Sequence, residues 1–200
     1  MTQTSASARL GLPEDAPVDG LTTRFLTDDA DYEPLSALIR ACHEHDGVPW
    51  LPTADNVRLD MRQDGIDPAR DVVLVALEGE LVALITVQRE VRDLVPTYDL
   101  WGKVAPRLRR RGIARWLLDW SLFLARERAA VEDPIGSVLL GAHVDERETG
   151  ARVLYEQGGV RAGPPVLPHA PRGARRRPRP APARRAEATT GATRPASNGL

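Results

Sequence analysis

Two apolar runs of strand length follow each other in the middle of the sequence, and they restrict the fold more than any other feature. The first, 71–77, contains the unbroken run Val-Val-Leu-Val-Ala-Leu, and the second, 81–91, follows directly across Glu78-Gly79. A pair of residues ending in glycine between two such runs is typical of a tight β-hairpin. We therefore expect a sheet that contains at least one antiparallel pair.

Helical periodicity before and after this hairpin predicts helices that flank the sheet. Apolar residues spaced i, i+3, i+4, i+7 begin at Leu35, Thr53 can cap a second helix, and a long apolar stripe follows Gly112. The remaining expected elements are three strands and a last helix: 22–26, 98–104, 137–144 and 148–157. The order β-α-α-β-β-β-α-β-α predicts an α/β (α+β) fold with a mixed, mostly antiparallel sheet.

The composition changes after residue 160. Positions 161–200 hold nine arginines and one glutamate, whereas the whole chain has a net charge of −1, so the first 160 residues are acidic. A segment of Pro, Arg, Ala, Gly and Thr cannot bury enough apolar surface to offset its ordering entropy. We expect a flexible leader over 1–20, one folded domain over 21–160 and a disordered tail over 161–200.

The sequence lacks features that several classes of protein require. A single cysteine, Cys42, excludes an internal disulfide and a zinc site of several thiolates. Residues 1–17 do not read as a secretory signal, and no apolar run is long enough to cross a membrane. His43 and His45 are spaced i, i+2 and point to different faces of a helix, so we expect a solvated helix end there. The expectation is a soluble cytoplasmic protein without a metal.

A basic turn lies between the strand that ends at Val104 and the helix that opens at Gly112. The first turn of a helix leaves N–H groups unpaired and carries partial positive charge, and a glycine lets a ligand approach the backbone. The turn and the start of the helix also hold four arginines suited to phosphates: Arg109, Arg110, Arg111 and Arg115. A diphosphate ligand fits this pattern, and so does a solvated basic turn before an amphipathic helix.

This segment resembles the acetyl-CoA-dependent N-acetyltransferase superfamily known as GNAT. The family motif is Arg or Gln, two residues, Gly, one residue, then Gly or Ala, and Arg109, Gly112 and Ala114 match it. The preceding Val104-Ala105-Pro106 is similar to the strand end of that family.

A second match lies downstream, in the segment 151–159 with the sequence Ala-Arg-Val-Leu-Tyr-Glu-Gln-Gly-Gly. It resembles the family segment with Ala, then Leu-Tyr-Glu, then Gly-Phe. Two residues depart from the family pattern: Glu148 stands where Asn is common, and Val160 where Phe is expected. The resemblance spans roughly 22–159 and makes 21–160 an N-acetyltransferase domain.

The resemblance implies an acetyl transfer in which an amine attacks the thioester of acetyl-CoA directly, so that Cys42 is not needed as a nucleophile. The Val104 N–H would stabilise the developing oxyanion, and Tyr155 would hydrogen-bond to the departing thiolate. The implied cofactor-binding residues form one continuous region: Val104, Ala105, Pro106, Arg109, Arg110, Arg111, Gly112, Ile113, Ala114 and Arg115.

An alkylamine is mostly protonated at neutral pH, and removing its proton costs roughly 4 to 5 kcal/mol. A base or a water chain is therefore needed. Asp99 and His143 lie on strands that flank the cleft in this family, but alternation along a strand can point either one into the cleft or away from it. The expected acceptor is a small-molecule or peptide amine, and a homodimer is compatible with the pattern.

The tail begins where the family continues with two further strands, so we expect these last two strands to be missing or scrambled. Codons permitted for 159–173 can also be read one nucleotide displaced as Gly-Phe-Glu-Pro-Val-Arg-Arg-Phe-Phe-His-Met-Arg-Arg-Glu, which is a plausible turn and strand. The hypothesis is a frameshift near Gly158-Gly159, and the underlying DNA sequence would test it.

Two other function classes compete with an active transferase. A CoA-binding module without catalysis follows if the acceptor side of the cleft cannot form. Nucleic-acid binding through the arginines of 161–200 is disfavoured, because that segment lacks interleaved aromatic residues and the body of the chain is acidic.

Overall fold

The computed structural model describes residues 11–133 and 135–160 of the chain. These residues form a five-stranded sheet with the spatial order β1-β2-β3-β4-β5, in which only the β4–β5 pair is parallel. The strands are β1 (Leu21–Phe25), β2 (Val72–Leu77), β3 (Glu80–Arg92), β4 (Val95–Val104) and β5 (Leu139–Ala142). The predicted mixed, mostly antiparallel sheet is confirmed.

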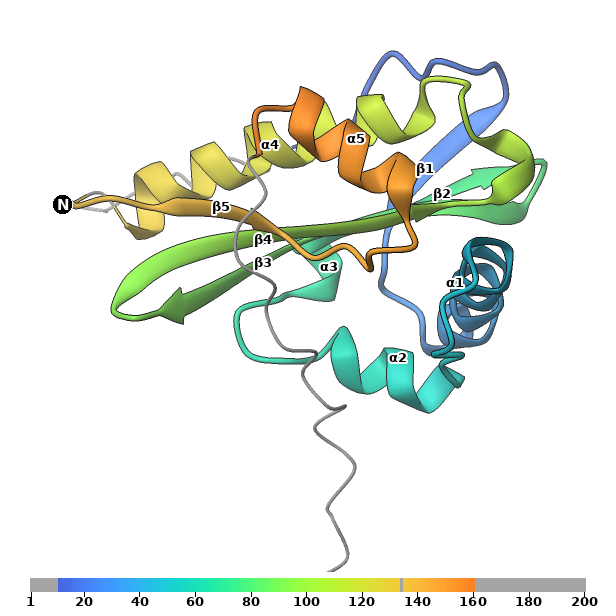
Figure 1. Cartoon of the computed structure of the whole chain (residues 1–200), viewed down its shortest axis with the longest axis horizontal. Helices are drawn as coiled ribbons and strands as arrows, with labels where there is room; N and C mark the ends of the chain where they lie inside the picture. The colour runs from blue at the N-terminus through green and yellow to red at the C-terminus, as the bar shows by residue number, and fades with distance from the viewer. Residues whose placement is uncertain (1–10, 134, 161–200) are drawn as a thin grey trace, which may run out of the picture. The chain divides into compact units, whose positions relative to one another are not determined.

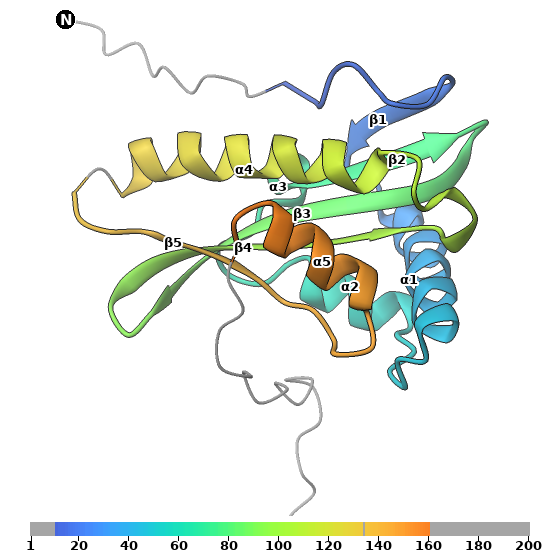
Figure 2. The same ribbon diagram turned by 45° about the horizontal axis from the view of Figure 1, so that its top comes forward.

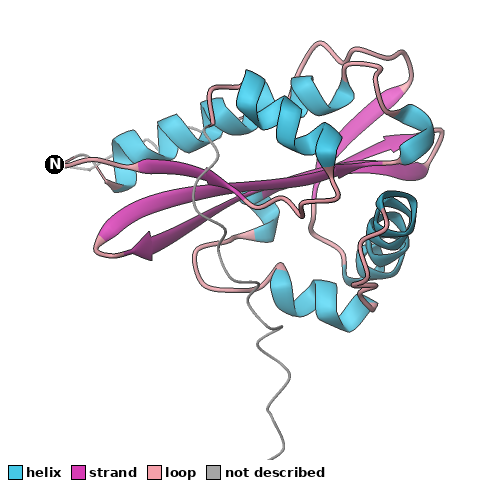
Figure 3. Ribbon diagram, in the orientation of Figure 1, coloured by secondary structure: helices cyan, strands magenta, loops and turns pink. Residues whose placement is uncertain are grey.

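The helices are α1 (Tyr32–Asp46), α2 (Ala54–Asp60), α3 (Pro68–Asp71), α4 (Ile113–Glu132) and α5 (Thr149–Gln157), with short 3-10 turns at η1 (Asp29–Asp31) and η2 (Pro106–Leu108). Only α3, a single turn capped by the Asp67 side chain, is absent from the predicted order. Figures 1 and 3 show α1 and α2 on one face of the sheet and α4 and α5 on the other.

The hairpin between β2 and β3 forms where the sequence predicts it. Both turn residues have positive φ, +52° at Glu78 and +83° at Gly79, as a two-residue turn between twisted strands requires. The run Val72–Val75 of β2 is buried throughout, because helices cover both faces of the sheet at this point.

The parallel pair of β4 and β5 is short. Its register runs from Thr97 opposite Leu139 to Leu100 opposite Ala142, where β5 ends, while β4 continues to Val104. Among the described residues, β4 therefore has no strand beside it on this side over its last four residues. We call this place the opening.

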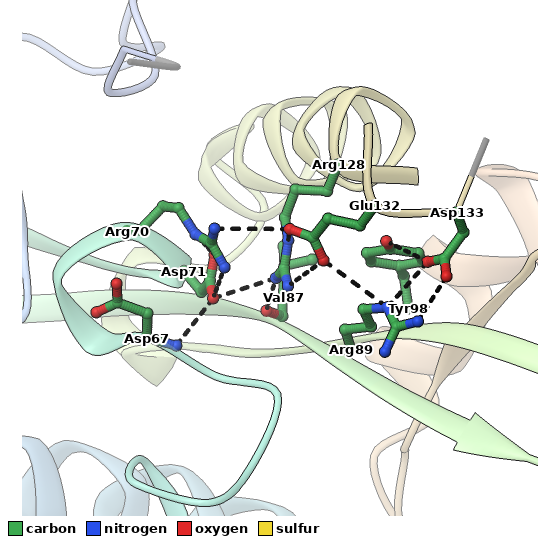
Figure 4. A network of polar contacts seen from close by, with 9 residues as sticks. All are labelled: Asp67, Arg70, Asp71, Val87, Arg89, Tyr98, Arg128, Glu132 and Asp133. Atoms are coloured by element: carbon green, nitrogen blue, oxygen red, sulfur yellow. Dashed lines mark hydrogen bonds and ion pairs between the residues drawn. The ribbon is translucent and has the colours of Figure 1, made fainter. Parts of the chain in front are cut away.

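A buried polar network ties the C-terminal half of α4 to the strands (Figure 4). Arg128 is 5% exposed and its Nη1 lies 3.1 Å from Oδ2 of Asp71, whose side chain is fully buried. The same Nη1 donates to the Val87 carbonyl oxygen at 3.2 Å. Other members of the network are Asp67, Arg70, Arg89, Tyr98, Glu132 and Asp133.

The segment 11–17, which we call the strap, lies along α4. The indole Nε1 of Trp116 donates to the Glu14 carbonyl at 2.5 Å, and that of Trp120 donates to the Gly11 carbonyl at 3.0 Å. We expected these residues to belong to a flexible leader, and the structure instead gives them contacts with the helix. Residues 1–10, and the predicted tail with its proposed frameshift, lie outside the described residues.

Candidate functional site

The predicted phosphate loop is a tight backbone turn that leads into α4. Arg110 and Gly112 both have positive φ, +61° and +86°. The first intrahelical hydrogen bond of α4 runs from the Trp116 N–H to the Gly112 carbonyl at 3.0 Å. The amides of 113–115 come before it and have no intrahelical acceptor. The loop therefore offers the unpaired N–H groups that bind phosphate oxygens at helix N-termini.

Gly112 cannot be replaced without strain. Its φ of +86° favours glycine, and a Cβ at this position would lie 3.2 Å from the Cβ of Pro17 in the strap. Glycine at this position thus allows the positive φ of the turn and leaves room for Pro17 of the strap.

The side chain of Arg109 does not face a ligand. Its Nη1 and Nη2 pair with the two carboxylate oxygens of Asp46 in α1 at 2.6 and 2.8 Å, and its Nε donates to the Val104 carbonyl at 3.2 Å. This hydrogen-bonded pair lowers the pKa of Asp46 and raises that of Arg109. Arg109 fixes the loop to α1, whereas Arg110 and Arg111 are exposed, as is Arg107, which pairs with Glu80 at 2.6 Å.

The amides of β4 that face the opening follow from the strand register. Ala105 donates its N–H to the Val82 carbonyl at 2.8 Å, so the next pair, Ala83 opposite Val104, is a non-hydrogen-bonded pair. By the same alternation the N–H groups of Gly102 and Val104 both point away from β3, toward the side where β5 has ended.

A second contact agrees with this assignment. Arg89 opposite Tyr98 is another of the non-hydrogen-bonded pairs between β3 and β4. The Arg89 N–H accordingly points away from β4 and donates to the Gly65 carbonyl at 2.9 Å. Gly102 also has no room for a side chain, because a Cβ would lie 2.7 Å from the Leu84 carbonyl oxygen.

Tyr155 reaches the opening from α5. Its side chain is buried and its hydroxyl donates to the Leu100 carbonyl at 3.5 Å, the last β4 residue that is paired with β5. Burial raises the pKa of Tyr155 above its ordinary value, with a smaller effect from the charge of Glu148. The hydroxyl is therefore a hydrogen-bond donor at neutral pH.

Tyr155 and the Val104 N–H do not meet at one point. Three full residues separate the Leu100 carbonyl from the Val104 N–H, which is roughly 10 Å along a strand. Gly102 lies between them, so its N–H is the opening amide nearer to the Tyr155 hydroxyl. The sequence motif could not resolve this, because it carries no information on where β5 ends.

The structure brings Asp99 and His143 together. Arg92 pairs with Oδ2 of Asp99 and lies 2.9 Å from Nε2 of His143, which is itself 3.7 Å from Oδ1 of Asp99. Oδ1 is buried and has no hydrogen-bond partner among the described residues. Asp99 raises the pKa of His143, chiefly through a hydrogen bond to the protonated ring.

This arrangement suits a ring that takes up a proton. Neutral His143 accepts from Arg92 at Nε2, whereas the protonated ring must donate there, and the unpartnered oxygen of Asp99 is the acceptor beside it. β5 ends at Ala142, so His143 is the first residue of the loop that follows it. Figure 1 shows this loop between β5 and α5.

Two buried groups near the opening were not expected from the sequence. Lys103 pairs with Glu148, the residue before α5, and their side chains are 4% and 9% exposed. His43 is 4% exposed and its Nδ1 lies 2.6 Å from the Trp50 carbonyl, so the expectation of a solvated helix end at this residue is wrong. A helix end that a following loop covers has no local signal in the sequence.

No group of three or more His, Cys, Asp and Glu residues that could hold a metal lies within 11–133 and 135–160. Over the same residues, no helix is both long and apolar enough to cross a bilayer.

Comparison with solved structures gives the class of protein. Over 70% of its length the chain is similar to a GCN5-related N-acetyltransferase from Sphaerobacter thermophilus, with 29% identity and a TM-score of 0.61. It spans only 43% of that protein. The fold is the one seen in GCN5-related N-acetyltransferases, which supports the resemblance to the GNAT superfamily.

More distant structures share the fold alone. The ribosomal-protein-S18-alanine N-acetyltransferase from Escherichia coli is 18% identical with a TM-score of 0.50, covering 70% of this chain and 76% of that one. A transcriptional regulator from Bacillus halodurans C-125 is 17% identical with a TM-score of 0.54, covering 74% and 98%. No protein-family model and no curated protein matches the sequence.

Proposed function

We propose that the chain binds acetyl-CoA and transfers its acetyl group to an amine by direct attack, without an acyl-enzyme. One observation carries the proposal: β4 loses its neighbour at Leu100, and the N–H groups of Gly102 and Val104 face the resulting opening beside Tyr155. An extended ligand can then pair with β4 in place of β5 and project a thioester into the sheet.

The loop before α4 is the proposed diphosphate site. The unpaired amides of 113–115 and the partial positive charge of a 20-residue helix favour an anion there. Arg110 and Arg111 add exposed positive charge, whereas Arg109 contributes by holding the loop to Asp46. Val104, Ala105 and the Pro106 turn connect this site to the opening.

At the thioester, the proposed oxyanion donor is the Gly102 N–H, with the Val104 N–H farther along the same edge. A backbone donor of this kind is worth about 10²- to 10³-fold in turnover. Tyr155 donates to the sulfur as the thiolate departs, and its raised pKa keeps the proton on the hydroxyl until then.

The proton of the acceptor ammonium goes to His143 in this proposal. Its Nε2 accepts the proton, and Asp99 stabilises the charged ring through the carboxylate oxygen that has no other partner. A base whose pKa lies near the working pH is the most effective one. The raised pKa of His143 moves it in that direction.

The proposal is tested by binding and by turnover on the full-length chain. Acetyl-CoA at about 100 times its Kd should stabilise the fold by about 2.7 kcal/mol, measured as a thermal shift. Thiol release should follow when kanamycin, spermidine or a peptide with an N-terminal alanine is added.

Tyr155→Phe provides the matched variant. It should lower kcat at least tenfold and leave the thermal shift by acetyl-CoA unchanged, since the ring keeps its packing. Unchanged kcat would remove Tyr155 from the reaction. Stabilisation by acetyl-CoA with no turnover on any amine would instead support a CoA-binding module without catalysis.

A further inference from the structure

Lys103 is the only lysine in the chain, and it lies in β4 between the two residues whose N–H groups face the opening. Its ammonium pairs with the carboxylate of Glu148, the residue before α5. The ion pair therefore crosses from β4 to the start of the helix that carries Tyr155. The end of β4 therefore carries an amine and two amides, and the helix that begins after Glu148 carries the phenol of Tyr155.

The Lys103 side chain lies on the face of β4 opposite to α4. Side chains alternate along a strand, and Tyr98 takes the α4 face, since its hydroxyl donates to Asp133 at the end of that helix at 2.8 Å. Lys103, five residues on, takes the other face, which α1 covers in Figures 1 and 2. Burial lowers the pKa of His43 in α1, and the positive charge of Lys103 lowers it further, in agreement with this placement.

This face is the one from which an acceptor would arrive. With its diphosphate at the loop before α4, as in the proposed function, acetyl-CoA brings its thioester into the opening from the α4 side of the sheet. A nucleophile then approaches the carbonyl carbon from the opposite side. Lys103 already presents a primary amine there.

We propose that the chain acetylates its own Lys103 when acetyl-CoA occupies the opening. The inference rests on the proposed function and adds a modification site to it. Three features of the structure support it together: the position of Lys103 beside Gly102, the side of the sheet on which its amine lies, and a carboxylate in direct contact with that amine.

The reaction balances with the groups present. The Lys103 ammonium passes one proton to Glu148, and the free Nζ forms a bond to the acetyl carbon while the carbon–sulfur bond breaks. A second proton leaves Nζ for the departing thiolate. The products are N-acetyl-lysine at 103, the CoA thiol, and a protonated Glu148 that releases its proton to solvent.

Acetylation of Lys103 would also break the ion pair beside the opening. An acetylated lysine has no charge, so the buried Glu148 carboxylate loses its cation. The start of α5 is then held less firmly, and we expect a lower melting temperature for the modified protein. The modification would limit the further use of the cleft.

The experiment follows acetyl incorporation into the full-length chain by intact-protein mass and peptide mapping. We expect one acetyl group at Lys103, at a rate that does not depend on protein concentration. Lys103→Arg keeps a cation beside Glu148 and should abolish this modification. Glu148→Gln should slow it at least about tenfold, while the thermal shift by acetyl-CoA persists in both variants.

Three results would overturn the inference and leave the proposed function standing. One is an unmodified Lys103 in a protein that acetyl-CoA stabilises and that acetylates an added amine. The second is a rate that rises with protein concentration, and the third is a rate equal to that of the chain unfolded in urea. If acetyl-CoA neither stabilises the protein nor acetylates any amine, the proposed function fails first and the inference fails with it.

Discussion

Arg128 is the residue whose loss should destabilise the domain most clearly through charge. Its guanidinium is 5% exposed and meets a fully buried Asp71 carboxylate, a backbone carbonyl and Glu132. Arg128→Met keeps the length of the side chain and removes every one of these donors. Breaking a buried pair costs 3 to 5 kcal/mol, and we expect about 3 kcal/mol, because Asp71 keeps its contact with Arg70.

Arg70→Met is the matched control. Arg70 contacts the same carboxylate, with Nε 2.8 Å from Oδ1 of Asp71, but its side chain is 47% exposed. Exposed pairs contribute about 0 to 1 kcal/mol, so this variant should cost less than about 1 kcal/mol. The two substitutions remove the same charge from the same partner and differ mainly in burial.

Urea unfolding, followed by tryptophan fluorescence and by circular dichroism, measures both costs. For a domain of this size about 3 kcal/mol corresponds to a drop in Tm of roughly 6 to 12 °C. A double variant, Arg128→Met with Asp71→Asn, should recover part of the loss because no uncompensated buried charge remains. An Arg128→Met cost within about 1 kcal/mol of the Arg70→Met cost would refute the argument from burial.

Three further predictions concern the site. Gly102→Ala places a methyl 2.7 Å from a backbone oxygen of β3 and should cost about 1 to 3 kcal/mol in urea unfolding, whereas Gly150→Ala, which meets nothing within 4 Å, should be neutral or stabilising. Replacing Arg110 and Arg111 by Ala should weaken acetyl-CoA binding by about 1 kcal/mol each in calorimetry, and the loss should shrink as salt is added. The folded pKa of His143 is raised above about 6.5, so its charged form stabilises the fold below that pH. The difference in urea midpoint between the native chain and His143→Asn should be present at about pH 5.5 and fade above the folded pKa, and a difference that grows with pH would contradict it.

Local signals predicted the fold well where one short stretch of chain decides the outcome. Glu78-Gly79 makes a hairpin because two positive φ angles are needed there, and the turn before α4 is marked by its glycine. The length of β5 is different, since the expected 137–144 shortens to Leu139–Ala142. That strand ends where β4 diverges from it, which is a property of two distant segments.

The site was predictable as a set of residues and not as a geometry. Asp99 and His143 were named, but only the register of Asp99 opposite Gly141 places them on a common side. Arg109 matches the motif, yet its guanidinium pairs with the carboxylate of Asp46, which is 63 residues away in the sequence. The roles of Lys103 and His43 depend on which loops cover them, and no local pattern carries that information.

The strap is held to α4 by its main chain as well as by apolar side chains, since Pro13 is buried and Leu12 packs against the core. Both tryptophan indoles donate to main-chain carbonyl oxygens, those of Glu14 and Gly11, which every residue type possesses. Substitutions at Gly11 and Glu14 can therefore leave these two hydrogen bonds in place, provided that the backbone path past Gly112 is kept. The two tryptophans, by contrast, supply both donors, so a side chain without an N–H at either position of the helix removes its hydrogen bond to the strap.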